Sequence, residues 1–146
     1  MSEERVEELL SELDTVLREL VSELEDKVGV IYLDVAHWTQ RYPVYKKRHG
    51  FEITRYDYES IHELIRDLLN LAEIEFDNFK IYATIEDGVT VWGYRSVENV
   101  YGRTVGTQYF IMSLAELIKL AREKAKAFDV SKLKTSLEKL LAEISG

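Results

Sequence analysis

The sequence predicts an α+β fold, in which a mostly antiparallel five-stranded sheet carries helices on its faces in the order α-β-β-α-β-β-β-α-α. Three observations lead to this prediction. Leucine and valine recur every three or four residues over 2–26, the spacing of a helix with one apolar face. Apolar and polar residues alternate on both sides of Asp87 and Gly88, as in a β-hairpin. Ser113 and Glu116 form the S-x-x-E capping box that opens a helix.

Two strands are expected to follow the first helix. Residues 28–36, VGVIYLDVA, form a nearly continuous apolar run, which is typical of a strand covered on both faces. Pro43 cannot donate a hydrogen bond to a sheet, so we expect it at a turn or at the start of an edge strand. Residues 44–56 are then expected to form an edge strand or a hairpin around Gly50.

The middle of the chain predicts a helix and a hairpin. Asp57 is a suitable N-cap for a helix that extends to about residue 74. In the hairpin over 79–94, a two-residue turn would place Glu86 opposite Val89. This register assigns six apolar residues to one face of the sheet: Phe79, Ile81, Ala83, Ile85, Trp92 and Tyr94.

A third strand of the hairpin region and two helices are expected to complete the fold. The strand covers about 103–112, and the next helix opens at Ser113. Asp129 or Ser131 then starts a last helix, which extends to about Ile144 and carries a second leucine stripe.

Length and composition limit the class of protein. At 146 residues the chain is long enough for one domain, which we assign to 1–128 with a C-terminal helical extension over 129–146 packed on it. It contains no cysteine, which excludes disulfides, thiolate metal sites and cysteine nucleophiles. No apolar run is long enough to span a membrane, and the acidic N-terminus is unlike a signal peptide. We therefore expect a cytoplasmic protein, and the scarcity of amides is typical of a thermophilic source.

One basic stretch, RYPVYKKRHGFEITRY (41–56), stands out in a chain of net charge -8. Five cations oppose one carboxylate within it, and four aromatic residues are interleaved with them. The stretch suits the solvated side of a strand, a docking patch for an acidic protein, or a nucleic-acid site in which cations meet phosphates and aromatic rings stack on bases. The residues that would dock a partner are Arg41, Lys46, Lys47, Arg48 and Arg55.

The sequence offers no established catalytic constellation. It contains neither a phosphate-binding glycine loop nor a G-x-S-x-G nucleophile motif. Asp34, His37 and His62 are the best candidates for a metal or acid-base site, yet the three histidines of the chain are spaced unlike known ligand sets. We therefore expect a protein without enzymatic activity, cofactor or metal.

Over residues 10–128 the helix-like and strand-like segments follow one another in an order that can be compared with known folds. The chain presents in turn LVSELEDKVG, VGVIYLDV, ESIHELIRDLLNLA, FKIYATIEDGVTVWGYR, QYFIMSL and AELIKLAREKAKAF. In type and order these segments resemble the Roadblock / dynein light chain family, small α/β domains with a five-stranded antiparallel sheet. The helix over 131–144 is an addition to that pattern.

The resemblance implies a non-catalytic homodimer that acts as a scaffold, an adaptor or a regulator of small GTPases. In that family two sheets join edge to edge, and the central helices pair across the two-fold axis. The implied dimer interface here comprises Ile61, Leu64, Leu68, Ile81 and Ala83. The basic stretch would then be available to an acidic protein or a small GTPase. A nucleic-acid-binding protein that uses residues 41–56 is the alternative.

Overall fold

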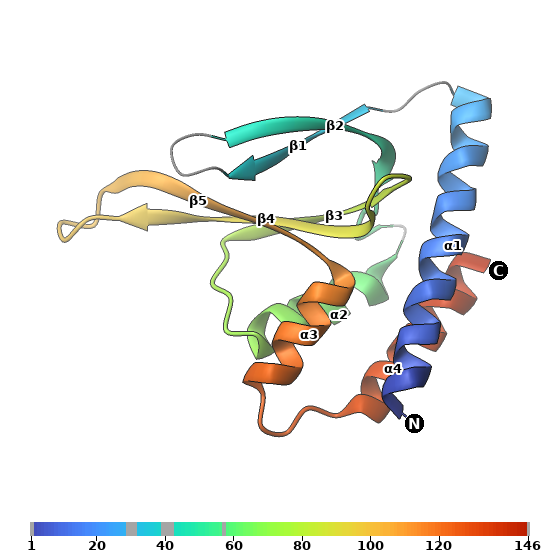
Figure 1. Ribbon diagram of the computed structural model, residues 1–146. Helices are drawn as coiled ribbons and strands as arrows, with labels where there is room; N and C mark the ends of the chain where they lie inside the picture. The colour runs from blue at the N-terminus through green and yellow to red at the C-terminus, as the bar shows by residue number, and fades with distance from the viewer. Residues whose placement is uncertain (1, 29–31, 39–42, 57, 146) are drawn as a thin grey trace.

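The computed structural model describes residues 2–28, 32–38, 43–56 and 58–145, with side chains over 4–23, 48–56 and 58–145. The α+β class is confirmed, because four helices accompany an antiparallel sheet in which β2, β3, β4 and β5 pair in that order (Figure 1). β1 pairs antiparallel with the first part of β2. The elements are α1 (Ser2–Val28), β1 (Tyr32–Trp38), β2 (Pro43–Glu52), α2 (Glu59–Leu71), β3 (Asn78–Thr84), β4 (Gly88–Glu98), β5 (Thr104–Ser113), α3 (Leu114–Lys124) and α4 (Val130–Ser145).

The core lies between one face of the sheet and the helices. α2 and α3 lie side by side below this face (Figure 1), and the ring of His62 on α2 lies 5.6 Å from the ring of Phe79 on β3. The sheet contributes five buried apolar residues to the core: Phe79, Ile81, Ala83, Val89 and Val91. Each fully buried large apolar side chain stabilises the fold by about 1.5–3 kcal/mol.

α1 and α4 pair with each other at the side of the core. Both helices contribute buried apolar residues to the core: Val6, Leu9, Leu13, Leu17 and Val21 from α1, and Leu133, Leu137 and Leu140 from α4. Two polar residues also fasten α1 to the turn between β3 and β4. Asp14 Oδ1 accepts a hydrogen bond from the Val89 backbone N–H at 3.3 Å, and the Arg18 guanidinium donates to the Ile85 carbonyl. The stripe predicted over 2–26 therefore packs within this chain.

The predicted hairpin exists, but its predicted register was wrong. Thr84 pairs with Gly88, where we expected Glu86 opposite Val89. The cause is the turn, which occupies three residues because Thr84 Oγ1 accepts a hydrogen bond from the Asp87 N–H at 3.0 Å and Gly88 has a φ of +72°. The flexible glycine thus ends the turn instead of standing at its centre.

The different register places the side chains of β4 on the opposite faces of the sheet from those predicted. Trp92 lies opposite Lys80, and Tyr94 lies opposite Asn78. Because alternate residues of a strand point to opposite faces, an odd shift moves Trp92 and Tyr94 away from the face that carries Ile81. The prediction that these aromatics share the core face is therefore corrected.

β2 also differs from its prediction, because it is neither an edge strand nor a hairpin around Gly50. The strand begins at Pro43, as proposed, and it runs through Gly50 to Glu52 between β1 and β3. A Cβ atom at Gly50 would lie 2.0 Å from the Ala83 carbonyl oxygen. The glycine therefore marks a close approach of two backbones and not a turn.

The N-caps of α3 and α4 are formed by residues that the sequence predicted. The capping box is confirmed, with the Glu116 N–H donating to Ser113 Oγ at 3.1 Å. Asp129, rather than Ser131, starts α4, because its Oδ1 accepts from the Lys132 N–H at 3.1 Å. Asp57 lies outside the described residues. The residue at the N-cap of α2 is Tyr58, whose side chain makes no capping hydrogen bond.

α2 ends three residues earlier than predicted, in a Schellman turn. The Ile74 N–H donates to the Leu69 carbonyl at 3.0 Å, and the Glu73 N–H donates to the Asn70 carbonyl at 3.1 Å. This geometry requires a left-handed residue just after the cap, and Glu73 supplies it with a φ of 58°. A side chain with a Cβ is strained there, and glycine is the residue usually found.

Replacing Glu73 by glycine is expected to raise the free energy of unfolding by about 0.5–1 kcal/mol, because it removes the left-handed strain. Urea denaturation monitored by circular dichroism measures this change. Glu63→Gly, within the same helix, is the control and should cost about 1 kcal/mol. A loss of stability in Glu73→Gly would contradict the prediction.

Candidate functional site

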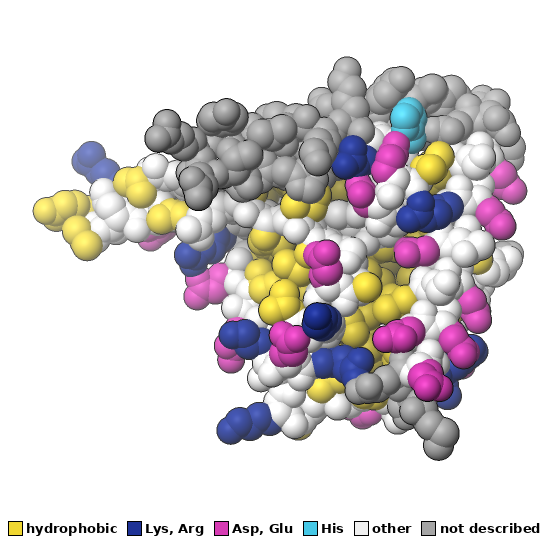
Figure 2. Space-filling view, viewed as in Figure 1, with side chains coloured by type: hydrophobic (Ala, Val, Ile, Leu, Met, Phe, Trp, Pro, Cys, Tyr) yellow, Lys and Arg dark blue, Asp and Glu magenta, His cyan; other side chains and the backbone are white. Residues whose placement is uncertain are grey.

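The outer end of the β4–β5 hairpin extends beyond the rest of the molecule (Figure 1). We name residues 96–107 the arm. Its tip carries large apolar side chains in water: Val100 is 93% exposed, Tyr101 is 85% exposed and Val105 is 62% exposed. Figure 2 shows this apolar tip in yellow at the far left. Such exposure adds nothing to folding, and it is the kind of feature found at binding surfaces.

Asn99 makes the hydrogen bonds that form the turn at the tip of the arm. The Asn99 Oδ1 accepts hydrogen bonds from the Tyr101 N–H at 2.9 Å and from the Arg103 N–H at 3.1 Å. The Gly102 N–H donates to the Asn99 carbonyl at 3.0 Å, and Gly102 has a φ of +77°. These bonds form a closed turn with Val100 and Tyr101 at its outer positions. An ordered turn loses little conformational entropy on binding, which favours association.

A bulge sets the direction of the third apolar residue. Val97 pairs with Gly106 and Glu98 pairs with Thr104, which leaves Val105 as an extra residue in β5. A bulge of this kind bends the hairpin and reorients the side chain at the irregular position. Val105 is thereby presented near the tip instead of within a regular ladder.

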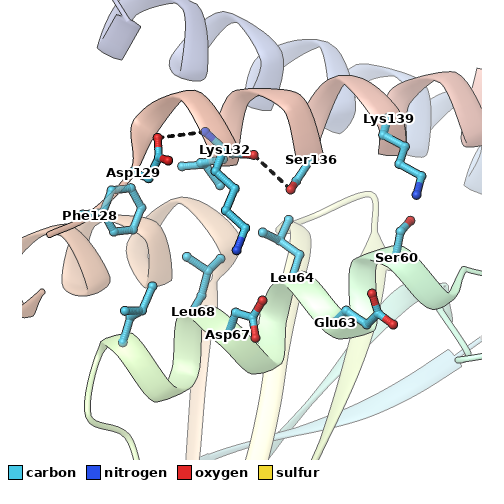
Figure 3. A pocket seen from close by; sticks show the side chains of 12 residues that line it. Ser60, Glu63, Leu64, Asp67, Leu68, Phe128, Asp129, Lys132, Ser136 and Lys139 are labelled. Atoms are coloured by element: carbon cyan, nitrogen blue, oxygen red, sulfur yellow. Dashed lines mark hydrogen bonds between the residues drawn. The ribbon is translucent and has the colours of Figure 1, made fainter.

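A second candidate surface is the groove between α2 and α4 (Figure 3), which we name the α2–α4 groove. Its volume is about 330 Å³, near the lower end of the range for binding pockets. Its floor is apolar and consists of Leu64, Leu68, Leu71, Phe128 and Leu133. Ser60, which also lines the groove, donates a hydrogen bond from Oγ to Glu143 Oε2 at 2.5 Å and so connects α2 to α4.

The two rims of the α2–α4 groove carry opposite charges. Glu63 and Asp67 line the α2 side, Lys132 and Lys139 line the α4 side, and Asp129 lies at the start of α4. In Figure 3 the Lys132 side chain extends from α4 across the groove toward α2. A ligand that carries both signs of charge on either side of an apolar centre would match this arrangement.

Of the five predicted docking residues of the basic stretch, two have described side chains, Arg48 and Arg55. Arg41 lies outside the described residues, and the side chains of Lys46 and Lys47 lie outside the described side chains. Arg48 forms an ion pair with Asp87 at the β3–β4 turn. Arg55 is exposed, beside a fully exposed Tyr56. Arg48, one of the predicted docking cations, therefore connects β2 to the β3–β4 turn.

His49 joins the same connection. Its Nδ1 lies 2.5 Å from Glu86 Oε1, and its backbone N–H donates to Glu86 Oε2 at 3.0 Å. Burial by itself would raise the pKa of Glu86. The pKa is nevertheless lowered below its ordinary value by hydrogen bonds from the His49 ring, the Glu86 backbone and the His49 backbone, and by the His49 charge. The ionised form of Glu86 therefore stabilises the fold.

This lowered pKa predicts a loss of stability in acid. The contribution of Glu86 is present above its ordinary pKa of 4.5 and disappears as the pH falls through the lower pKa of the folded state. Between about pH 6 and about pH 3, the free energy of unfolding should therefore fall less in Glu86→Gln than in the unchanged protein, by roughly 0.5 kcal/mol at this partly exposed site. Urea denaturation at several pH values measures it, with Glu138→Gln as the control. Parallel pH profiles would refute the prediction.

Four of the five predicted dimer residues are buried in the core of the single chain. Ile61, Ile81 and Ala83 are completely covered, and Leu68 is 2% exposed. Their side chains are therefore unavailable to a second copy. The fifth, Leu64, is half-buried and lines the α2–α4 groove. α2 contacts α3 and α4, so its apolar face is covered within the chain except at Leu64 and Leu71, which line the groove.

Of the three candidates for a metal or acid-base site, only His62 has a described side chain. Asp34 and His37 lie outside the described side chains. His62 Nε2 lies 2.8 Å from the Ile53 carbonyl oxygen, which is a structural contact between α2 and the segment after β2. Among the described residues, no group of three or more potential ligands could hold a metal ion.

The second face of the sheet carries a cluster of aromatic rings. The Trp92 ring lies 5.9 Å from the Tyr94 ring and 5.5 Å from the Tyr109 ring. β1 also approaches β5, so the sheet curls, and these rings are half-buried. Tyr82 on the same face has a pKa raised by burial and then by the Glu52 charge, so it remains a neutral phenol. The rings of Trp92, Tyr94 and Tyr109 thus pack against one another on β4 and β5 next to the base of the arm.

Comparison with protein-family models, curated proteins and solved structures finds no match to this chain. Among the helices that the structure describes, none combines the length and apolar character that crossing a bilayer requires. The arm and the α2–α4 groove are thus the features on which a functional proposal can be based. The sequence does not single out Val100 and Tyr101, although the flanking Asn99 and Gly102 are residues typical of turns.

Proposed function

We propose that the protein is a non-catalytic interaction module that works as a homodimer. The observation that carries the proposal is the arm, on which an ordered turn presents Val100 and Tyr101 almost fully to water. Two of the three histidines also have structural partners, since His49 contacts Glu86 and His62 contacts the Ile53 carbonyl. The scaffold or small-GTPase role implied by the Roadblock resemblance would belong to the assembled dimer, with an acidic partner as its target.

The net charge bears on how such a dimer would form. A chain of net charge -8 repels a second copy at long range, so apolar contact must supply the attraction. Val100, Tyr101 and Val105 are the largest exposed apolar side chains of the arm, and burying them would provide it.

The double variant Val100→Ser/Tyr101→Ser is expected to be monomeric under conditions in which the unchanged protein is a dimer. Both side chains are exposed, so the double substitution should leave the free energy of unfolding nearly unchanged. Size-exclusion chromatography with light scattering over a concentration series measures the mass. Tyr56→Ser is the matched control, because Tyr56 is also fully exposed but lies outside the arm. If the unchanged protein stays monomeric at the highest concentration, the homodimer proposal fails.

A further inference from the structure

We infer that the tip of the arm inserts into the α2–α4 groove of a second copy of the chain. This inference rests on the proposed homodimer and names the surfaces that form it. The argument uses three properties of the two surfaces: their direction in the fold, their size and apolar character, and their charges.

The arm cannot fill the groove of its own chain. It extends away from the body on the side opposite α4, while the groove is formed by α2 and α4 (Figures 1 and 3). Each chain therefore presents one projecting apolar element and one apolar cavity that face different directions. Two copies can satisfy both elements at once by reciprocal exchange, which closes a two-fold dimer.

The dimensions and chemistry of the two surfaces agree. The groove, at about 330 Å³, suits one or two large side chains rather than a whole helix. Its floor includes Leu71, which is 41% exposed, and the half-buried Leu64 and Phe128. Tyr101 and Val100 would cover this floor, and an aromatic anchor in a pocket is a common centre of binding energy.

The charges on either side of the tip also match those of the rims. Glu98 ends β4 and Arg103 lies just before β5, so one acid and one base flank the apolar turn. The α2 rim carries Glu63 and Asp67. The α4 rim carries Lys132 and Lys139 together with Asp129, whose carboxylate caps α4, so this rim keeps a net positive charge. In one orientation of the arm, Arg103 meets the acidic rim while Glu98 meets the basic rim. The reverse orientation places like charges together and is disfavoured.

Engineered cysteines provide a direct test, because the chain contains no cysteine of its own. Thr104→Cys places a thiol beside the tip without removing Val100, Tyr101 or Arg103. Ser136→Cys places one in the groove. When the two single variants are mixed and treated with a short bis-maleimide, we expect a covalent heterodimer of the two. Mixing Thr104→Cys with Ser22→Cys, an exposed site on α1, should give none.

A charge exchange provides the second test. Arg103→Glu should weaken dimerisation about tenfold, since it places an acid against the acidic rim. Adding Glu63→Lys and Asp67→Lys should restore most of the affinity, whereas the two lysine substitutions alone should weaken the dimer. All of these sites are exposed, so folding should be preserved.

The outcomes separate this inference from the proposed function. A dimer that gives neither the mixed cross-link nor the charge rescue would overturn the inference and leave the homodimer intact. A strict monomer would overturn both. A cross-linked dimer with twice the 17.0 kDa mass of one chain, together with charge rescue, would establish the exchange.

Discussion

Replacing Gly50 by alanine is expected to lower the free energy of unfolding by about 3 kcal/mol, the upper range for overpacking a rigid site. The new Cβ would lie 2.0 Å from the Ala83 carbonyl oxygen and 2.9 Å from the Thr84 Cα. Both atoms belong to the backbone of β3, which pairs with β2 at Gly50 and Thr84. The strain cannot be relieved by a side-chain rotation, so the two strands must separate locally.

The matched control for this substitution is Gly106→Ala. Gly106 is also in a strand, but nothing lies within 4 Å of the position of its Cβ, and its φ is not in the left-handed region. We expect Gly106→Ala to be neutral or to stabilise the protein by up to about 1 kcal/mol through the unfolded state. Urea denaturation of both variants gives the comparison. Similar small effects at the two sites would show that β2 and β3 are not held this close.

Replacing Leu137 by alanine is expected to cost about 3 kcal/mol, within the range measured for cavities left by buried leucines. Leu137 is completely buried in the core cluster, and α4 packs along α1. The substitution therefore tests whether the last helix is part of the cooperative core. The same loss should appear whether unfolding is followed by helix content or by tryptophan fluorescence.

Leu71→Ala is the control for the leucine substitution. Leu71 is 41% exposed at the end of α2, so its truncation should cost less than about 1 kcal/mol. If Leu137→Ala instead produced two separate unfolding transitions, the region over 129–146 would behave as an extension that unfolds by itself.

Much of the fold could be predicted from the sequence because its determinants are local. The heptad-like spacing of α1, the Ser113–Glu116 cap and the Asp129 cap each depend on residues within one or two turns of helix. The hairpin was also predicted correctly, although its turn covers residues 85–87 and Gly88 is the first residue of β4. Its register was not, because it depends on whether Thr84 Oγ1 bonds within the loop, and that choice is invisible in the alternation of apolar residues.

The candidate site was harder to predict because it depends on long-range packing. Val100 and Tyr101 stand between Asn99 and Gly102, a pattern that predicts a turn. Nothing local indicates whether that turn folds over the body or projects from it. The α2–α4 groove likewise exists only after two helices far apart in sequence come together. The same packing buried Ile61 and Leu68, which the resemblance had assigned to a dimer surface.

The pairing of α1 with α4 has a consequence for how the chain folds during synthesis. α1 ends at Val28 and α4 begins at Val130, so the apolar stripe of α1 leaves the ribosome well before its partner helix is made. At about 5–20 residues per second, several seconds separate the two events. During that interval the apolar face of α1 has no α4 to pack against, so it is exposed to water or bound by a chaperone. The pairing of α1 with α4 can therefore form only after the sheet and α3, which lie between them in the sequence, have been synthesised.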